Sequence, residues 1–304
     1  MYLEHFGLRE WPFSITPDTS FFFSSDSAQS GLNLLLIAAR AGEGFIKITG
    51  EVGTGKTLLC RRLMQKLGQG FKVAYLPNPY LEPMSLYLEL ASELGISWGE
   101  NLAPPNQHAL IKRLNERLIE LSAEGLQAVV CLDEAQAMPI ETLEALRLLT
   151  NLETEKRKLL QVIIFGQPEL EEKLNHPSVR QLKQRITFDY QLTALSRDDL
   201  NYYLHHRLKV AGHNGGRLFT KASIRLLTRR TQGSPRLINI VAHKALMAAY
   251  GKGKKMIDYF DVHAACRDTA SVQKRKQRPA WMLGGSFVLL GGVVAAALYW
   301  IPTA

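Results

Sequence analysis

The stretch Gly50-Glu51-Val52-Gly53-Thr54-Gly55-Lys56-Thr57 decides the fold of this chain. An apolar run at 45–49 precedes it and a helix-forming run at 58–64 follows it, which is the strand, loop and helix context of a phosphate-binding P-loop. The glycines let several backbone N–H groups point at one spot, where the helix N-terminus adds partial positive charge. The pattern predicts that all eight residues bind ATP, with Lys56 on the β- and γ-phosphates and the Thr57 hydroxyl on Mg²⁺.

Two adjacent carboxylates end a second apolar run. Residues 128–132 are apolar throughout, as in a strand buried on both faces of a parallel sheet, and Asp133 and Glu134 follow directly. Downstream of a complete P-loop, this pattern predicts that Asp133 holds the Mg²⁺ shell and that Glu134 polarises the attacking water as a general base. After the apolar run 160–165, Gln167 stands where it could reach the γ-phosphate and the water. The alternative is a polar residue that only ends a strand.

The remaining patterns predict an open parallel α/β sheet followed by a small helical domain. The predicted strands are 45–49, 72–76, 128–132, 160–165 and 186–192. The predicted helices of the first part are 27–40, 58–64, 84–94, 107–121 and 140–151. In such a sheet the ligand binds at the carboxyl ends of the strands. From Ser196 the pattern is wholly helical, with a capped start and further helices at 220–231, 236–250 and 259–270.

The first 26 residues are rich in aromatic residues and prolines. Prolines argue against regular structure here, and the aromatic side chains need burial. The sequence therefore predicts an irregular strap that wraps onto a domain and closes its core. Contact of the strap with an adenine ring is a second interpretation, and the two are compatible.

Charge is distributed unevenly along the chain. Residues 1–200 hold 20 Lys and Arg against 25 Asp and Glu, whereas residues 201–278 hold 17 against 3, and residues 279–304 hold none. The basic second domain predicts an anionic partner, with nucleotide phosphate, anionic lipid and nucleic acid as candidates. Three scattered cysteines give neither metal-ligand spacing nor a disulfide framework, which fits a reducing compartment. The N-terminus does not have the pattern of a cleavable signal peptide.

Residues 280–301 contain no charged side chain and are long enough to cross a hydrocarbon core of about 30 Å. Trp281 and Trp300 stand near its ends, as interfacial aromatic residues do, and basic residues at 274–278 precede it. The sequence predicts a transmembrane helix at 280–301, anionic lipid near 274–278, a cytoplasmic N-terminal part and a periplasmic C-terminus. The alternative, a buried core helix, fits less well because the segment is apolar on all sides.

These motifs together resemble the AAA+ superfamily and, within it, the ExeA-like ATPases of secretion and pilus assembly. The strap Gly7-Leu8, Pro12-Phe13, Pro17-Asp18 and Phe21-Phe22-Phe23 resembles theirs. So do the P-loop, Leu132-Asp133-Glu134-Ala135-Gln136 and Gly166-Gln167-Pro168-Glu169-Leu170. The resemblance covers about residues 1–270. With the resemblance we expect an AAA+ domain over 1–195 and a helical lid over 196–272. The sequence pattern itself adds a basic linker over 273–279 and the membrane helix over 280–301.

The resemblance also implies roles for arginines. Gly233-Ser234-Pro235-Arg236 is similar to the sensor-2 motif, in which Arg236 reaches from the lid to the γ-phosphate. Arg180 and Arg185 lie where the superfamily places a finger that acts across a subunit interface, and Arg185 is favoured. Ordinary surface arginines are the alternative for all three. A finger would require a homo-oligomer, expected to be a ring.

The function that the resemblance implies is ATP hydrolysis coupled to assembly of a type IV pilus of the MSHA kind or a type II secretion machine. We expect ATP and Mg²⁺ as cofactors, inner-membrane or periplasmic assembly proteins as partners, and the bacterial inner membrane as location. ExeA continues into a periplasmic peptidoglycan-binding domain, so here a membrane partner is expected to contact peptidoglycan. The alternatives are a DNA-acting ATPase that regulates transposition, against which the apolar segment argues, and a nucleotide-gated scaffold.

Overall fold

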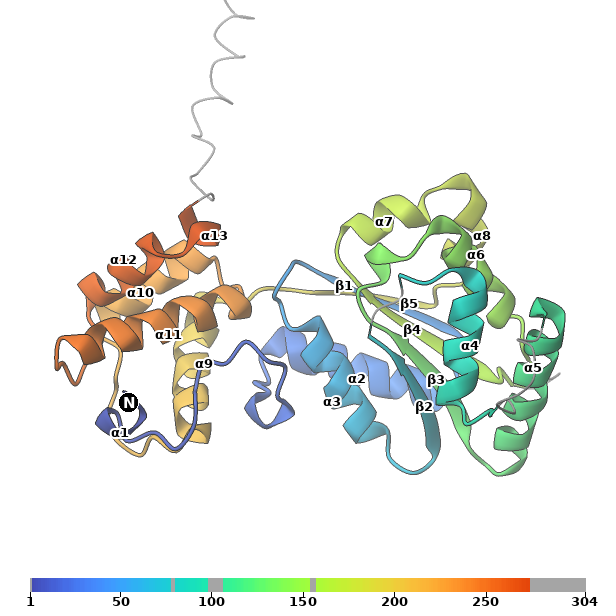
Figure 1. The fold of residues 1–304 in the computed structure, drawn as a ribbon, viewed down its shortest axis with the longest axis horizontal. Helices are drawn as coiled ribbons and strands as arrows, with labels where there is room; N and C mark the ends of the chain where they lie inside the picture. Colours follow the sequence, from blue (N-terminus) through green and yellow to red (C-terminus); the bar gives the residue numbers. More distant parts are fainter. Residues whose placement is uncertain (1, 78–79, 98–105, 154–156, 274–304) are drawn as a thin grey trace, which may run out of the picture.

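The computed structural model describes residues 2–77, 80–97, 106–153 and 157–273, which form an α/β unit and a helical unit (Figure 1). The α/β unit is built on a five-stranded sheet in the order β2-β3-β4-β1-β5. All neighbouring strands are parallel. The strands are β1 (Phe45–Gly50), β2 (Phe71–Leu76), β3 (Gln127–Leu132), β4 (Leu160–Gly166) and β5 (Phe188–Leu192).

Side-chain alternation along the central strands feeds two separate cores, which is why their sequences are apolar throughout. Ile46 and Ile48 of β1 pack with α2 (Asp26–Ala41) and α3 (Lys56–Leu67) on one face. Phe45 packs on the other face, which is covered by three helices. These are α4 (Pro83–Glu93), α5 (Gln107–Ala123) and α6 (Ile140–Leu149). The five predicted strands and the helices that flank them are confirmed.

Several short elements were not predicted. They are the helices α7 (Glu169–Leu174) and α8 (Arg180–Lys183) and the 3₁₀ turns η1 (Thr19–Phe21), η2 (Ala135–Ala137) and η3 (Pro177–Val179). Elements of three to six residues are too short to show a period and are held by tertiary contacts. The predicted start of the last strand at 186 was wrong, because Ile186 still donates its backbone N–H to Lys183 in the turn that closes α8.

The helical unit contains α9 (Arg197–Val210), α10 (Lys221–Thr231), α11 (Pro235–Gly251), α12 (Tyr259–Arg267) and α13 (Ala270–Gln273). The predicted capped start is confirmed, since Ser196 and Asp199 form a reciprocal capping box. The predicted helix 259–270 is instead two helices, because α12 ends at Arg267. The predicted division between residues 195 and 196 falls between β5 and α9 (Figure 1).

The N-terminal strap completes the core of the helical unit. Phe6, Phe13 and Phe21 are buried there against α9 and α11. The strap begins with a short helix, α1 (Tyr2–His5), so the expectation of wholly irregular structure was wrong for these residues, which precede the first proline. Tyr2 is buried, and its hydroxyl is hydrogen-bonded to His243 of α11 at 2.9 Å. Packing on the lid therefore stabilises a helix that is too short to form alone.

In the part of the chain that the structure describes, no helix combines the length and the apolar character that crossing a bilayer requires. The predicted membrane helix at 280–301 and the basic residues 274–278 lie outside the described residues.

Candidate nucleotide-binding site

The P-loop connects β1 to α3 and curls around the Lys56 side chain. Lys56 Nζ donates to the carbonyl oxygens of Gly50 at 2.7 Å and Glu51 at 3.1 Å. Gly53 and Gly55 have φ angles of 79° and 105°, in the left-handed region that favours glycine. Burial lowers the pKa of Lys56, while nearby carboxylates, Glu134 foremost, oppose that shift. The loop thus presents a partly desolvated ammonium at the N-terminus of α3, where an anion would be stabilised.

The two residues predicted to hold Mg²⁺ contact each other across the cleft. Asp133 directly follows β3, is 2% exposed and is hydrogen-bonded to the side chain of Thr57 at the start of α3. Its Oδ1 also accepts the backbone N–H of Glu134 at 3.0 Å. Burial raises the pKa of Asp133, and the Thr57 hydrogen bond acts in the opposite direction. A hydroxyl and a buried carboxylate side by side provide the hard oxygen donors that suit Mg²⁺.

Glu134 is held in place by two glutamine amides. Its Oε2 accepts Nε2 of Gln136 at 2.5 Å and Nε2 of Gln167 at 3.0 Å. Gln136 Oε1 in turn accepts the backbone N–H of Gln167 at 2.9 Å, which joins the ends of β3 and β4. Glu134 has a φ angle of 54°, in the left-handed region that is uncommon outside glycine. The sequence analysis gave no role to Gln136, although this residue belongs to the motif Leu132-Asp133-Glu134-Ala135-Gln136.

The lid contacts the P-loop directly through the start of α11. The backbone N–H of Arg236 donates to the carbonyl of Gly53 at 3.2 Å, and Ser234 Oγ lies 3.5 Å from the carbonyl of Val52. A Cβ atom on Gly53 would lie 2.6 Å from Cβ of Arg236. The second P-loop glycine position is therefore fixed by the approach of the lid as well as by its φ angle. The Arg236 side chain lines the same cleft as Lys56.

The cleft between the two units has a volume of about 290 Å³. It is lined by strap residues 14–18, the P-loop, Glu134, Gln167, Tyr203, Arg207, Arg236 and Asn239. A larger hollow of about 900 Å³ lies where β2, β3 and β4 begin and contains none of the motif residues. Since open α/β sheets bind ligands at the carboxyl ends of their strands, the smaller cleft is the candidate site.

The strap reaches the cleft because α9 holds it there. Arg207 is 4% exposed, and it donates from Nε to the carbonyl of Pro12 at 2.5 Å and from Nη2 to that of Ser14 at 3.0 Å. Its guanidinium lies 4.3 Å from the ring centroid of Phe21. From the other side, Arg61 of α3 donates to the carbonyl of Pro17 at 2.8 Å. Sequence reasoning missed Arg207, whose partners are about 200 positions away along the chain.

The two arginines proposed as a finger lie away from this cleft within one chain. Arg180 is exposed, and Arg185 donates to the hydroxyl of Thr150 at 2.8 Å. A role for either in hydrolysis needs a second subunit, so the assignment stays a prediction.

The residues present fit a nucleoside triphosphate with Mg²⁺. The P-loop glycines leave the backbone N–H groups of the loop uncovered by side chains. Among the described residues, Lys56 Nζ is hydrogen-bonded to the loop carbonyls of Gly50 and Glu51, and Thr57 lies beside Asp133. The fold and the site define a P-loop nucleotide-binding protein with AAA+ architecture, a five-stranded parallel sheet and a helical lid. Residues 39–174 match the family model described as an AAA domain.

Solved structures support this fold. The chain is similar to the ORC2 protein of Aeropyrum pernix in its ADPNP–ADP complexes, with 18% identity, 81% of this chain and 70% of that chain covered, and a TM-score of 0.60. Cdc6p from Pyrobaculum aerophilum has 20% identity, 83% and 70% coverage, and a TM-score of 0.61. The RuvB branch migration motor of Thermotoga maritima has 14% identity, 81% and 70% coverage, and a TM-score of 0.54.

A relative that is similar over nearly the whole chain is a secretion protein. The chain is 37% identical over 300 residues to the general secretion pathway protein A of Aeromonas hydrophila. This match covers 99% of the chain but 54% of the relative, so the chain spans about half the length of the protein that it resembles. The similarity includes both the α/β unit and the lid.

Proposed function

We propose that this chain is a membrane-anchored ATPase that drives or regulates assembly of a type II secretion machine or a related type IV pilus. The observation that carries the proposal is the 37% identity with general secretion pathway protein A, which extends over the nucleotide site and the lid alike. A finer assignment, to the MSHA pilus biogenesis ATPase MshM, rests on sequence resemblance alone.

The arrangement of side chains supports hydrolysis as well as binding. Lys56 and the P-loop amides would bind the β- and γ-phosphates, and Thr57 with Asp133 would hold Mg²⁺, which supplies charge neutralisation on the phosphates when bound. Glu134 would accept a proton from the attacking water, with Gln136 and Gln167 fixing its carboxylate. An intact Glu134 in a polar network favours turnover over a nucleotide-gated scaffold.

Subunit and membrane contacts complete the proposal. Arg236 would sense the γ-phosphate from the lid, and Arg185 or Arg180 would act on a neighbouring subunit in a homo-oligomeric ring. Residues 280–301 would anchor the chain in the bacterial inner membrane, with the ATPase cytoplasmic and the C-terminus periplasmic. Inner-membrane or periplasmic assembly proteins would then receive the conformational change.

The test begins with two variants of the full chain. Lys56→Ala should lose nucleotide binding, whereas Glu134→Gln should bind ATP and fail to hydrolyse it. The Glu134→Gln protein, held in ATP and purified from detergent-solubilised membranes, should recover pilus or secretin-assembly proteins. Unchanged turnover in Glu134→Gln would remove the general-base role, and the absence of assembly proteins would remove the secretion role.

A DNA-acting ATPase is the second candidate, and the basic lid is the observation that favours it. Residues 201–273 hold 13 Lys and Arg against three Asp. Recovery of nucleic acid or transposition proteins with Glu134→Gln would favour this function.

A further inference from the structure

The lid carries a basic helix face whose positive charges have no acidic partner. Lys221, Arg225 and Arg229 are spaced four residues apart along α10, and all three are exposed. Arg230 follows at the helix end and is also exposed. Among the described residues no ion pair joins these four side chains to a carboxylate. Like charges at this spacing destabilise an isolated helix, so the face is suited to an anionic partner.

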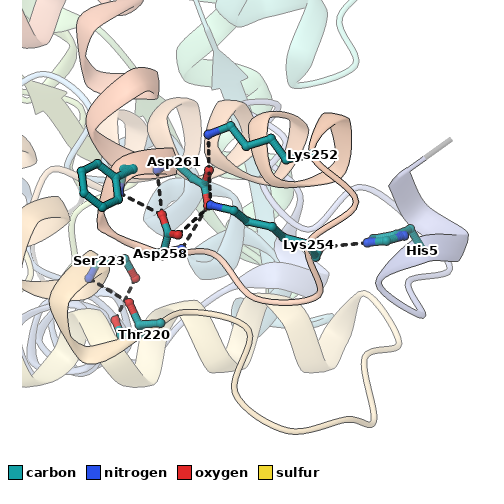
Figure 2. A network of polar contacts seen from close by, with 8 residues as sticks. His5, Thr220, Ser223, Lys252, Lys254, Asp258 and Asp261 are labelled. Carbon is teal, nitrogen blue, oxygen red and sulfur yellow. Dashed lines mark hydrogen bonds and ion pairs between the residues drawn. The ribbon is translucent and has the colours of Figure 1, made fainter.

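The acidic side chains of the lid are already used elsewhere. Figure 2 shows Lys254 donating to Asp258 and Asp261, and Lys252 donating to Asp261 at 2.7 Å. Asp261 is fully buried, and the hydrogen bond from Lys254 lowers the pKa of Asp258 to about 2. Another lid carboxylate, Asp268, pairs with Lys244 at 2.8 Å. The remaining two, Asp198 and Asp199, lie in the first turn of α9, where Asp199 forms the capping box with Ser196. Among the described residues, no ion pair joins a lid carboxylate to the α10 face.

The basic face runs toward the point where the described chain ends. A parallel bridge between Phe219 and Ile257 starts α10 and α12 side by side, and the two helices then pack together (Figures 1 and 2). At the far ends of the two helices, the positive charge of Arg230 lowers the pKa of the Cys266 thiol, against the larger effect of burial. Cys266 is four residues before α13. The last turn of α10 therefore lies near α13, which ends at Gln273.

The chain that follows limits how far this face can be from a membrane. If residues 280–301 span the bilayer, the linker 274–279 reaches at most ~20 Å even when fully extended. α10 is about 16 Å long at 1.5 Å per residue. The anchor would hold the end of α13 within ~20 Å of the headgroups and the far end of α10 within ~36 Å of them. The whole face can therefore reach the headgroups, where basic residues are attracted to anionic lipid.

Two exposed aromatic residues belong to the same pair of helices. Tyr259 and Phe260, in the first turn of α12, are 43% and 71% exposed. A headgroup layer accommodates such side chains, whereas the phosphate backbone of a nucleic acid duplex offers them no apolar surface.

We propose that the α10 face of the lid, formed by Lys221, Arg225, Arg229 and Arg230, docks on the anionic headgroups of the membrane in which the chain is anchored. The inference rests on the proposed anchor. Docking would fix the lid against the bilayer, so that nucleotide-driven movement displaces the α/β unit relative to the membrane.

Flotation of the full chain with vesicles separates docking from anchoring. The vesicles contain phosphatidylcholine alone or with 30% phosphatidylglycerol, and Ala222→Cys on α10 carries a fluorophore that transfers energy to labelled headgroups. Transfer should be high only with phosphatidylglycerol and should fall in 0.5 M NaCl, because the Debye length then drops below its physiological ~8 Å. Flotation itself should survive salt if the anchor is inserted.

The decisive variant is Lys221→Gln/Arg225→Gln/Arg229→Gln. Each basic residue near an anionic surface contributes about fivefold to the binding equilibrium, so removing three should lower the ratio of docked to undocked lid ~100-fold. The matched control Arg40→Gln/Lys66→Gln/Lys112→Gln removes three exposed charges from the α/β unit and should leave transfer unchanged. Both variants should keep the native circular dichroism and nucleotide binding.

Each failure has its own signature. Energy transfer that is the same with and without phosphatidylglycerol, and the same in the α10 variant, would overturn the proposed docking. Flotation lost in salt, with transfer still dependent on the α10 charges, would refute the anchor while supporting the docking. Binding of a 30-base-pair DNA duplex that is lost in the α10 variant, with no response of energy transfer to phosphatidylglycerol, would overturn the lipid assignment in favour of nucleic acid.

Discussion

Arg207 offers the sharpest test of how the strap serves the nucleotide site. It is buried in the lid, donates to the strap carbonyls of Pro12 and Ser14 and stacks on Phe21. Arg207→Lys keeps the positive charge but removes the planar fork and the stacking surface. One lost hydrogen bond to a charged group and a weakened cation–π contact together cost about 2 kcal/mol. That free energy corresponds to roughly 30-fold in the ratio of docked to undocked strap.

Since residues 14–18 line the cleft, undocking of the strap should weaken the apparent affinity for nucleotide. We expect Arg207→Lys to raise the Kd for a fluorescent ADP analogue by about tenfold, with ~30-fold as the ceiling. Chymotrypsin should cleave faster after Phe13 and Phe21, which are buried in the native strap. Arg197→Lys, at an exposed position of the same helix, is the control and should change neither quantity. A native Kd together with native proteolysis in Arg207→Lys would refute the reasoning.

Three further predictions concern catalysis, pH and the sheet. Glu134→Gln should lower kcat by about 10²–10⁴, the usual contribution of a general base, with a nearly native Kd for ATP in equilibrium titration. Because burial raises the pKa of Asp133, the ionised carboxylate destabilises the fold once the pH exceeds that pKa. Asp133→Asn should therefore have a higher Tm than the native chain at pH 7 in EDTA, by about 2–4 °C for each kcal/mol of destabilisation removed, and this difference in Tm should shrink as the pH falls. Lys47 is 3% exposed and forms ion pairs with Glu171 and Asp189. Glu171→Gln/Asp189→Asn should lower the free energy of unfolding in urea by about 3 kcal/mol because the buried ammonium loses both partners, whereas Lys47→Met leaves two half-exposed carboxylates and should lower it by under ~1 kcal/mol. Equal losses in the two variants would contradict this account.

The parts of the site that were predicted are those encoded by local patterns. The P-loop is a contiguous stretch, and Asp133 and Glu134 follow directly on a strand whose apolar run is visible in the sequence. Because parallel strands present their carboxyl ends at one edge, both motifs and Gln167 come together in any such sheet. In the structure Glu134 and Gln167 line one cleft with the P-loop, while their roles in binding and hydrolysis stay predictions.

The remaining parts depend on contacts between distant residues. Arg207 lies in a helix whose pattern shows only an apolar face, and nothing local indicates that its guanidinium binds carbonyls near the N-terminus. Gln136 acquires its role because η2 turns its amide back toward Glu134. The short helix α8, next to the predicted finger residues, has only four residues and no period of its own.

The position of the strap gives the nucleotide site a mechanical consequence. Phe13 and Phe21 belong to the buried core of the lid, yet residues 14–18 line the cleft of the α/β unit. The lid also rests on the P-loop through the Arg236 N–H bond to Gly53. A movement of the lid must therefore pull the strap with it, because burial of the strap aromatics is a larger interaction than the few polar contacts to α3. Lid position and the geometry of the cleft are thus coupled twice, through α11 and through the strap, and any partner that fixes the lid would act on the nucleotide site by both routes.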